Sequence, residues 1–235
     1  MIYVASDIHG NYDRYEKLLN KINLTEKDAL IILGDILDRG DDGIKIMLDV
    51  MQRDNIFTIL GNHEQIALAC LETLNQEITE ESINSLQEDT IEMLVEWIYN
   101  LGGQATIDEY SKLSQAEKED VLEYIDQMPL YEEFTINNQK YWLVHGGLEN
   151  FTKEKEIDEY TADELVWNRI DYGMKYFDDI VIITGHTPTF TIEYNPKPGF
   201  IFKINNHIAI DCGCDSSEGQ LGCICLNTME EIYIK

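Results

Sequence analysis

The chain of 235 residues has 45 acidic side chains against 17 Lys and Arg, which gives a formal net charge of -28. This excess of negative charge repels nucleic acids and anionic lipid surfaces, so we expect neither a nucleic acid nor a membrane as a partner. The length and the 44% hydrophobic content are typical of one globular α/β domain, which we expect to span residues 1–235.

The N-terminus shows none of the features of a secretion signal. Residues 1–4 lead to Asp7 without a basic region, a long apolar segment or a small-residue cleavage site. No window of the sequence approaches the roughly 18 apolar residues of a membrane helix. A cytoplasmic location is therefore expected.

The first quarter of the chain alternates short apolar runs with helical patterns. Strands are predicted over 2–5, 29–33 and 56–60, and helices over 12–22 and 44–53. This order is typical of a βαβαβ unit, whose parallel strands end at one edge of the sheet. Ligand sites of such sheets lie beyond the carboxyl ends of the strands, so we expect the chemistry there.

A helical segment is predicted over about residues 65–127. Its apolar residues recur at spacings of three and four, as in Ile91, Leu94, Val95 and Ile98. Gly102-Gly103 interrupts the pattern, and no motif for chemistry is visible in it. We expect ordinary packing helices or, alternatively, a helical insertion that covers the site and shapes the choice of substrate.

The remainder of the chain is dominated by strand patterns. Strands are predicted over 133–136, 141–144, 180–184, 200–204, 207–211, 221–226 and 231–234. One helix is predicted over 161–170. Asn205-Asn206 tolerates positive φ and indicates a hairpin between two of the strands. These strands predict a second sheet.

Four of the five cysteines form two Cys-X-Cys pairs near the C-terminus: Cys212, Cys214, Cys223 and Cys225. One interpretation is a metal or redox site. However, structural zinc sites more often use Cys-X2-Cys spacing, and the alternation over 210–214 and 221–226 predicts strands. Buried strand cysteines are therefore the first interpretation.

Five polar clusters with glycines follow predicted strands. They are Asp-Ile-His-Gly at 7–10, Gly-Asp-Ile-Leu-Asp-Arg-Gly at 34–40, Gly-Asn-His-Glu at 61–64, His-Gly-Gly at 145–147 and Gly-His-Thr-Pro at 185–188. Four of the five histidines lie in these clusters, whereas His207 does not. A single histidine after a strand is more often a satisfied surface or core residue. Together, however, imidazoles and carboxylates suit borderline divalent metals, and the sequence predicts a metal centre.

The clusters resemble the signature motifs of the phosphoprotein phosphatases, which are calcineurin-like metallophosphoesterases, and they occur in the order of that family. The match runs from Asp7 to Thr187 and extends to Asp211, and it is most similar to the bacterial and bacteriophage branch of serine/threonine phosphatases. The resemblance implies a four-layer α/β/β/α sandwich with two mixed sheets. Periodicity alone also permits a single doubly wound sheet.

The resemblance also implies a role for each motif residue. The implied metal ligands are Asp7 and His9 for one ion, Asp35 as a bridge, and Asn62, His145 and His186 for the other. His63 matches the general acid, which Asp38 orients. Arg39 faces the phosphate, and Asn62 lies beside it. Arg169, in a Trp-X-Arg element, matches a second phosphate-binding arginine, although a solvated helix arginine is the alternative.

The implied mechanism is hydrolysis of a phosphate monoester by in-line attack of a hydroxide that bridges two divalent metal ions. Mn²⁺ is the first choice for these ions, with Fe or Zn²⁺ as alternatives. The ions and both arginines make the pocket locally positive, so the acidic surface does not exclude a phosphate substrate.

Three hypotheses remain for the function. The first is a serine/threonine protein phosphatase, whose partner is a phosphorylated protein or a small phosphoester. The second is a symmetrical hydrolase of dinucleoside polyphosphates such as diadenosine tetraphosphate, because such enzymes have similar motifs. The third is an inactive domain that only binds phosphorylated partners, which the presence of Asp38, His63 and both arginines argues against.

Overall fold

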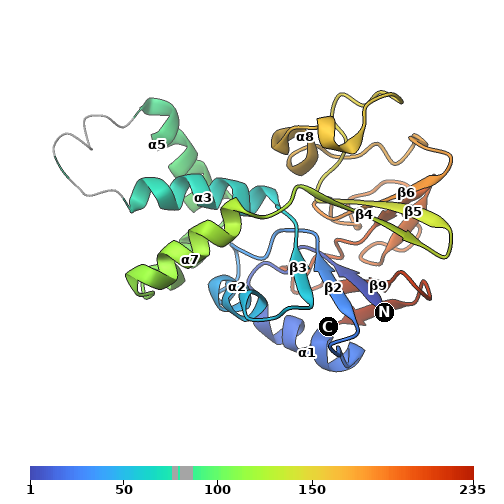
Figure 1. Ribbon diagram of the computed structural model, residues 1–235. Helices are drawn as coiled ribbons and strands as arrows, with labels where there is room; N and C mark the ends of the chain where they lie inside the picture. The colour runs from blue at the N-terminus through green and yellow to red at the C-terminus, as the bar shows by residue number, and fades with distance from the viewer. Residues whose placement is uncertain (76–78, 80–86) are drawn as a thin grey trace.

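The structure is a computed structural model that describes residues 1–75, 79 and 87–235. Ten strands form two five-stranded sheets in the described part of the chain. The first sheet has the strand order β10-β9-β1-β2-β3, and the second has the order β4-β5-β6-β8-β7. The two sheets pack against each other, with helices beyond them (Figure 1).

The first sheet contains the predicted βαβαβ unit. Its elements are β1 (Ile2–Ala5), α1 (Tyr12–Ile22), β2 (Ala29–Ile32), α2 (Gly43–Met51) and β3 (Ile56–Thr58). The pairs β1–β2 and β2–β3 are parallel, whereas β9 (Leu221–Cys225) is antiparallel to β1 and to β10 (Glu231–Ile234). Helix α1 buries Tyr15, Leu18 and Ile22 at spacings of three and four.

The second sheet is also mixed. Its strands are β4 (Tyr131–Ile136), β5 (Gln139–Val144), β6 (Ile180–Thr184), β7 (Phe202–Ile204) and β8 (His207–Ala209). Strands β5, β6 and β8 are parallel, while β4 and β7 run antiparallel to their neighbours. The predicted hairpin joins β7 to β8, with Asn205 at φ 49° and Asn206 at φ 58°.

The layers follow from three clusters of buried side chains. The inner cluster joins the facing sides of both sheets through residues such as Val4, Ile31, Leu143, Ile183 and Ile224. A second cluster packs the other face of the first sheet against α1 and α2, and a third covers the outer face of the second sheet. The predicted sandwich of two mixed sheets with outer helices is therefore confirmed.

Helices fill the chain between β3 and β4. They are α3 (Asn62–Leu74), α5 (Glu88–Val95), the π-helical turn η1 (Glu96–Asn100), α6 (Gln104–Tyr110) and α7 (Gln115–Asp126). They project to one side of the two sheets (Figure 1). The prediction of helices over 65–127 is confirmed for the described residues, and its part at 76–78 and 80–86 lies outside them.

Two predicted elements are shorter than expected. The helix predicted over 161–170 is α8 (Ala162–Val166), with Thr161 as its N-cap, and a 3-10 turn (Ile157–Glu159) precedes it. The strand predicted over 210–214 is wrong beyond β8, because the backbone turns at Gly213 with φ 74°. Arg14 holds this turn by donating from Nη1 to the carbonyl oxygen of Cys214 at 2.5 Å.

All five cysteines are buried and free. Burial raises the pKa of Cys212, Cys214 and Cys223, which favours the neutral thiol at each position. No group of cysteines in the described chain brings its sulfur atoms together as a metal site would. The buried interpretation of these residues fits the structure.

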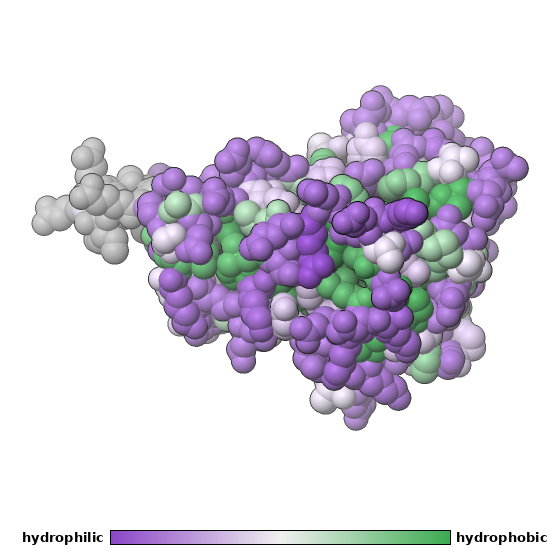
Figure 2. All heavy atoms as spheres, turned by 60° about the horizontal axis from the view of Figure 1, so that its bottom comes forward, coloured by the Kyte–Doolittle hydropathy of each residue, from purple (hydrophilic) through white to green (hydrophobic). Residues whose placement is uncertain are grey.

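The surface agrees with the acidic composition. Hydrophilic side chains cover most of the face shown in Figure 2, with apolar side chains visible between them. No helix among the described residues is long and apolar enough to cross a membrane.

The histidine outside the motifs lies in the second sheet. His207 is 2% exposed, and its ring contacts those of Tyr172 and Tyr176 at centroid distances of 5.9 and 5.1 Å. Neither ring nitrogen has a hydrogen-bond partner among the described residues. Burial lowers the pKa of His207 from 6.5 to about 4, against a smaller opposing effect of Asp171.

This burial predicts a loss of stability in acid. The folded protein keeps His207 neutral while the unfolded chain binds a proton below pH 6.5, so stability is lost as the pH falls from 6.5 towards 4. Between pH 7 and pH 5, the free energy of unfolding should fall by about 2 kcal/mol more in the unsubstituted chain than in His207→Leu. Urea unfolding at several pH values measures this difference. Ile208→Leu should keep the original pH dependence, and an equal slope in His207→Leu would contradict the prediction.

Candidate metal centre

The predicted metal ligands and His63 come from the carboxyl ends of five strands. Asp7 and His9 follow β1, Asp35 follows β2, and Asn62 and His63 follow β3. His145 and His186 follow β5 and β6 of the second sheet. The N–H of His9 donates to the Asp35 carbonyl at 2.9 Å, and that of Gly185 to the His145 carbonyl at 2.9 Å. Both sheets therefore deliver side chains to one place.

The backbone at these strand ends adopts left-handed conformations that side chains other than glycine rarely take. Asp7, His9, Asp35 and His186 have φ of 53°, 46°, 56° and 59°. Such conformations persist only where the surroundings hold them, and they are frequent at functional sites. The sharp reversals turn each side chain back towards the space beyond the sheet edge.

Two groups of potential metal ligands share one carboxylate. His9, Asp35 and His63 form the first group, and Asp35, His145 and His186 the second, each with ligand atoms within 4.8 Å of one another. Asp35 Oδ2 lies 3.7 Å from Nε2 of His9 and 3.3 Å from Nε2 of His145. Imidazole nitrogen and carboxylate oxygen suit a divalent transition metal, so the donor set fits a metal centre.

The other two predicted ligands lie beside these groups. The Asp7 carboxylate accepts hydrogen bonds from the N–H of His186 at 3.1 and 3.0 Å, and another from the Ser6 hydroxyl. Asn62 Oδ1 accepts from Nε2 of His145 at 2.9 Å. The structure therefore brings all six predicted ligands together, with His63 in the first group where Asp7 was expected.

The electrostatics of the centre are set by burial. Burial raises the pKa of Asp7 to about 7, and the charge of Asp35 adds to the increase. Burial also acts to raise the pKa of Asp35, but the imidazoles of His145 and His63 hold it well below its usual range. The two buried carboxylates repel each other, and a bound cation would relieve that repulsion.

Two imidazoles of the centre are kept neutral. Burial lowers the pKa of His9 to about 3, and burial together with the charge of His145 lowers that of His186 to about 3. His145 behaves differently, because Asp35 and Asp7 outweigh its burial and raise its pKa to about 10. A neutral imidazole has a lone pair free for a metal, so His9 and His186 are ready to act as ligands.

His63 and Asp38 form a buried pair at the edge of the centre. His63 Nδ1 lies 2.7 Å from Asp38 Oδ2, and Nη2 of Arg39 donates to His63 Nε2 at 3.1 Å. Because the guanidinium can only donate, Nδ1 carries the proton towards Asp38 in this arrangement. Burial opposes protonation of His63, but Asp35 and Asp38 raise its pKa above the usual value. The pair can therefore hold or release a proton at Nε2.

Three acidic residues have contacts that the sequence analysis did not assign. Glu64 accepts hydrogen bonds from the N–H groups of Asp35, residue 36 and residue 37, between 2.7 and 3.0 Å. Asp215 forms an ion pair with Arg39 at 2.9 Å. Asp211 lines the site, where burial and the charge of Asp7 raise its pKa well above the usual range. Glu64 and Asp211 lie within the matched region and were open to prediction, whereas Asp215 carries no motif.

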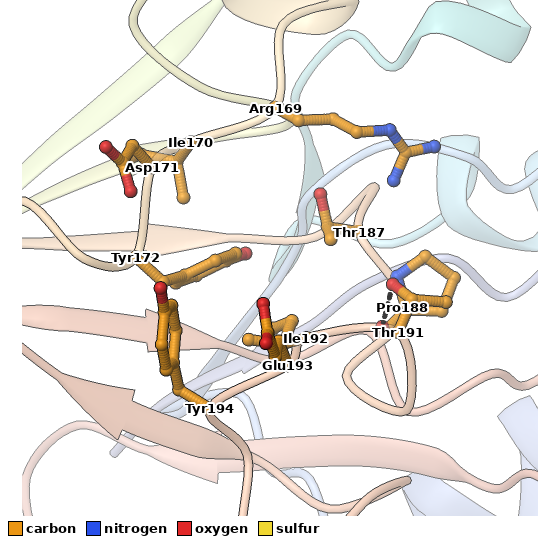
Figure 3. Close-up of a pocket in the computed structure, with 10 residues that line it drawn as sticks. All are labelled: Arg169, Ile170, Asp171, Tyr172, Thr187, Pro188, Thr191, Ile192, Glu193 and Tyr194. Carbon is orange, nitrogen blue, oxygen red and sulfur yellow. Dashed lines mark hydrogen bonds between the residues drawn. The ribbon is translucent and has the colours of Figure 1, made fainter.

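The centre opens into a cavity of about 290 Å³. Its lining residues are Asp7, Asp35, Arg39, Asn62, His63, Leu101, Trp167, Arg169, His186, Pro188 and Asp211. A pocket of about 560 Å³ adjoins it, and both share Arg169 and Pro188. In Figure 3 the rings of Tyr172 and Tyr194 stand on one side of this pocket, with Arg169 on the other.

The family model of calcineurin-like phosphoesterases matches residues 1–212. The chain belongs to this family. The family predicted from the motifs is thus confirmed.

This chain is similar to relatives that are named for two different activities. A symmetrical bis(5'-nucleosyl)-tetraphosphatase of Wigglesworthia glossinidia brevipalpis is 35% identical over 100 residues, which are 41% of this chain and 36% of the relative. Serine/threonine-protein phosphatase 2 of Escherichia coli (strain K12) is 28% identical over 169 residues, 71% of this chain and 66% of the relative. The matches therefore span about one third to two thirds of these relatives.

A solved structure assigned as a diadenosine tetraphosphatase shares the fold. Its TM-score is 0.67 at 16% identity, and the comparison covers 99% of this chain and 92% of that one. At this identity the likeness concerns the fold alone.

Because both ligand groups share Asp35, we expect its replacement to impair metal binding more than replacement of a residue from one group. Asp35→Asn keeps the shape of the side chain but removes the charge that both ligand groups use, so it should lose Mn²⁺ at both, whereas His186→Asn should lose it at one. Equilibrium dialysis followed by metal analysis gives the bound metal per chain. Asp171→Asn, a carboxylate outside both groups, serves as the control and should retain all of the metal. Full occupancy in Asp35→Asn would show that Asp35 is not shared.

Proposed function

We propose that this chain is a metal-dependent phosphatase in which water attacks the phosphorus of a phosphate monoester and His63 protonates the leaving oxygen. The observation that carries the proposal is the buried His63–Asp38 pair at 2.7 Å beside two ligand groups that share Asp35. Metal ligands, a proton donor and two arginines meet in one cavity, and this combination suits phosphoryl transfer to water.

In the ligand assignment, Asp35 would be common to the two ion sites. Asp7 and His9 would hold one divalent ion, and Asn62, His145 and His186 would hold the other, with Mn²⁺ as the first choice. Such ions, when bound, neutralise charge on the phosphoryl group and lower the pKa of a bound water. Since His63 is the proton donor in this assignment, its place in the first ligand group reflects nearness to Asp35 at 3.9 Å.

Arg39 and Arg169 bind the phosphate oxygens in this proposal. Both guanidinium groups line the cavity, and Arg169 Nη1 donates to the carbonyl oxygen of His186 at 3.3 Å. A guanidinium matches two phosphate oxygens with a fixed pair of donors. Asp215 holds one side of Arg39 at 2.9 Å, which keeps that side chain at the rim of the cavity.

His63 and Asp38 perform the acid step. In the structure Nε2 accepts a hydrogen bond from Arg39. When that guanidinium turns to the phosphate, Nε2 is free to carry a proton, which can pass to the ester oxygen as the bond to phosphorus breaks, while Nδ1 stays bonded to Asp38. The carboxylate of Asp38 stabilises the charged imidazole before this transfer and fixes the plane of its ring.

A phosphorylated serine or threonine in a protein is the first candidate substrate. The relative from Escherichia coli that acts on such residues matches 71% of this chain. The cavity also carries Trp167 at its rim, where the side chain is 41% exposed and free to contact an approaching peptide.

The adjoining pocket favours a dinucleoside polyphosphate as the second candidate. Tyr194 is 61% exposed at its rim, and an aromatic ring there can stack on a nucleobase. Asp171 and Glu193 offer carboxylate oxygens to ribose hydroxyls, while Arg169 lies between this pocket and the metal centre.

Replacement of the proton donor tests the proposed chemistry. His63→Asn should reduce hydrolysis of a phosphoserine peptide by about 10²–10⁴-fold, because the serine oxygen is a poor leaving group without a proton. Phosphate release from metal-stripped protein, with and without added Mn²⁺, measures this loss. His207→Leu, which removes a histidine outside the site, should keep the activity. No metal-dependent turnover of any ester by the unsubstituted chain would favour an inactive binding domain instead.

A second measurement separates the two substrates. If the pocket binds a nucleobase, Tyr194→Ala should raise the KM for diadenosine tetraphosphate by about 5- to 100-fold, the cost of one lost stacking contact. The KM for p-nitrophenyl phosphate should not change. Phe57→Ala removes an exposed aromatic ring that lies far from Tyr194 in the sequence. It is the control for general effects of losing such a ring. A larger kcat/KM for the phosphopeptide than for the dinucleotide, with no effect of Tyr194→Ala, would select the protein phosphatase.

A further inference from the structure

The Asp38 carboxylate has more partners than His63. Asp38 is fully buried, and its oxygens accept three hydrogen bonds from side chains. Oδ2 accepts from His63 Nδ1 at 2.7 Å and from Trp97 Nε1 at 2.9 Å, while Oδ1 accepts from the Thr106 hydroxyl at 2.6 Å. The hydroxyl of Thr106 in turn accepts from the N–H of Asp38 at 3.1 Å. Both carboxylate oxygens and the backbone N–H of Asp38 are therefore hydrogen-bonded.

Two of these partners come from the helices between β3 and β4. Trp97 lies on the π-helical turn η1, and Thr106 lies on α6. Both are fully buried or nearly so, at 0% and 1% exposed. These helices carry none of the five sequence motifs, yet two of their side chains bond Asp38, which belongs to a motif.

The Gly102-Gly103 pair allows this approach. The carbonyl oxygen of Gly102 accepts from the N–H of Arg39 at 3.1 Å, and a side chain at Gly102 would press against the Arg39 backbone. The indole ring of Trp97 lies so close to Gly103 that any Cβ there would overlap it. The glycine pair, which in the sequence is only a break in a helical pattern, is therefore a point of close contact with the loop that carries Asp38 and Arg39.

These contacts also hold a strained backbone. Asp38 and Arg39 are consecutive residues with φ of 68° and 67°, in the left-handed region that both side chains disfavour. Such a pair needs contacts on both sides to persist. Thr106 bonds the N–H of Asp38 and Gly102 bonds the N–H of Arg39, so the helical segment supplies both.

We propose that Trp97 and Thr106 are positioning residues for the acid step, which makes the helical segment a working part of the site. Resting on the proposed function, this assignment gives each residue a defined task. The indole N–H and the threonine hydroxyl fix the rotation of the Asp38 carboxylate, so that Oδ2 faces His63 Nδ1 and the Nε2 proton faces the leaving oxygen. Without these donors the carboxylate turns, and the proton is delivered less often.

The test is the dependence of the rate on the leaving group. Trp97→Phe keeps an aromatic ring and Thr106→Val keeps the shape of the side chain, but each removes one donor to Asp38. We expect each to lower kcat/KM for phenyl phosphate by about 10-fold, and for 2,4-dinitrophenyl phosphate by about 2-fold or less, because a good leaving group needs no proton. A residue with only a structural role would lower both rates together.

Matched variants control for damage to the fold. Trp142→Phe removes a second buried indole that donates to a carboxylate, Glu133 at 3.0 Å, and should lower neither rate selectively. Thr106→Ser keeps the hydroxyl and should restore the rate with phenyl phosphate. If Thr106→Val fails to fold, Thr106→Ser and Trp97→Phe still decide the outcome.

A double substitution distinguishes this inference from the proposed function. In an Asp38→Asn background, Trp97→Phe should have no further effect on the leaving-group dependence, since it acts through Asp38. If Trp97→Phe and Trp142→Phe behave alike while His63→Asn still impairs phenyl phosphate selectively, the positioning role is wrong and the phosphatase stands. If His63→Asn shows no such selectivity, the acid step itself is wrong.

Discussion

The buried negative charge of Asp35 is the interaction on which the rest of the site depends. The residue is 2% exposed, and a carboxylate at such depth is unstable unless other groups compensate its charge. The imidazoles that follow β3 and β5 supply that compensation, with the Nε2 atoms of His63 and His145 at 3.9 and 3.3 Å from Oδ2. These strands belong to both sheets, so the charge is tolerated only where the edges of the sheets meet.

The backbone around Asp35 is fixed by a second buried carboxylate. Glu64 accepts from three consecutive N–H groups beginning at Asp35, which would otherwise be buried without partners. Gly61 stands between the two acids, where a Cβ would collide with both carboxylates. The Gly-Asn-His-Glu cluster therefore contributes more than a candidate ligand and the proposed proton donor, because its first and last residues shape the loop that carries Asp35. This accounts for the close packing of the two motifs despite their separation in the chain.

Most of the fold, and the meeting of the candidate ligands at one edge of the sheets, could be predicted from the sequence for one physical reason. Short apolar runs such as 2–5 and 180–184 are bounded by polar clusters with glycine, and parallel strands carry those clusters to one edge. Where the pattern is decided by distant contacts, prediction fails. The alternation over 210–214 indicates a strand, but Arg14, about two hundred residues earlier, bonds the carbonyls of a turn there.

The partners of Asp38 were hidden for the same reason. Trp97 lies in an amphipathic stretch where an aromatic residue is most simply a core residue, and its indole N–H has no visible partner in the neighbouring sequence. The partner is Asp38, 59 positions away. Only the glycine pair hinted at a close approach, and a break in a helical pattern has many causes. Assigning ligands to particular ions likewise needs more than motif order, as the nearness of His63 to Asp35 shows.

The strongly acidic chain and a phosphate substrate are compatible because the two act at different distances. Charges on the surface are screened beyond about 8–10 Å at physiological salt, so most of the net charge of -28 contributes little inside the cavity. Within the cavity, the arrangement of the few charged groups determines whether a phosphate can bind. Asp215 pairs with one side of Arg39 and leaves Nη2 to reach the ring of His63, which is the side where a phosphate would lie. Arg169 has no carboxylate that close to it among the ion pairs of the described residues, so its guanidinium is available to an anion. The acidic surface then favours substrates whose negative charge is concentrated at the phosphate over extended polyanions, which would meet it along their whole length.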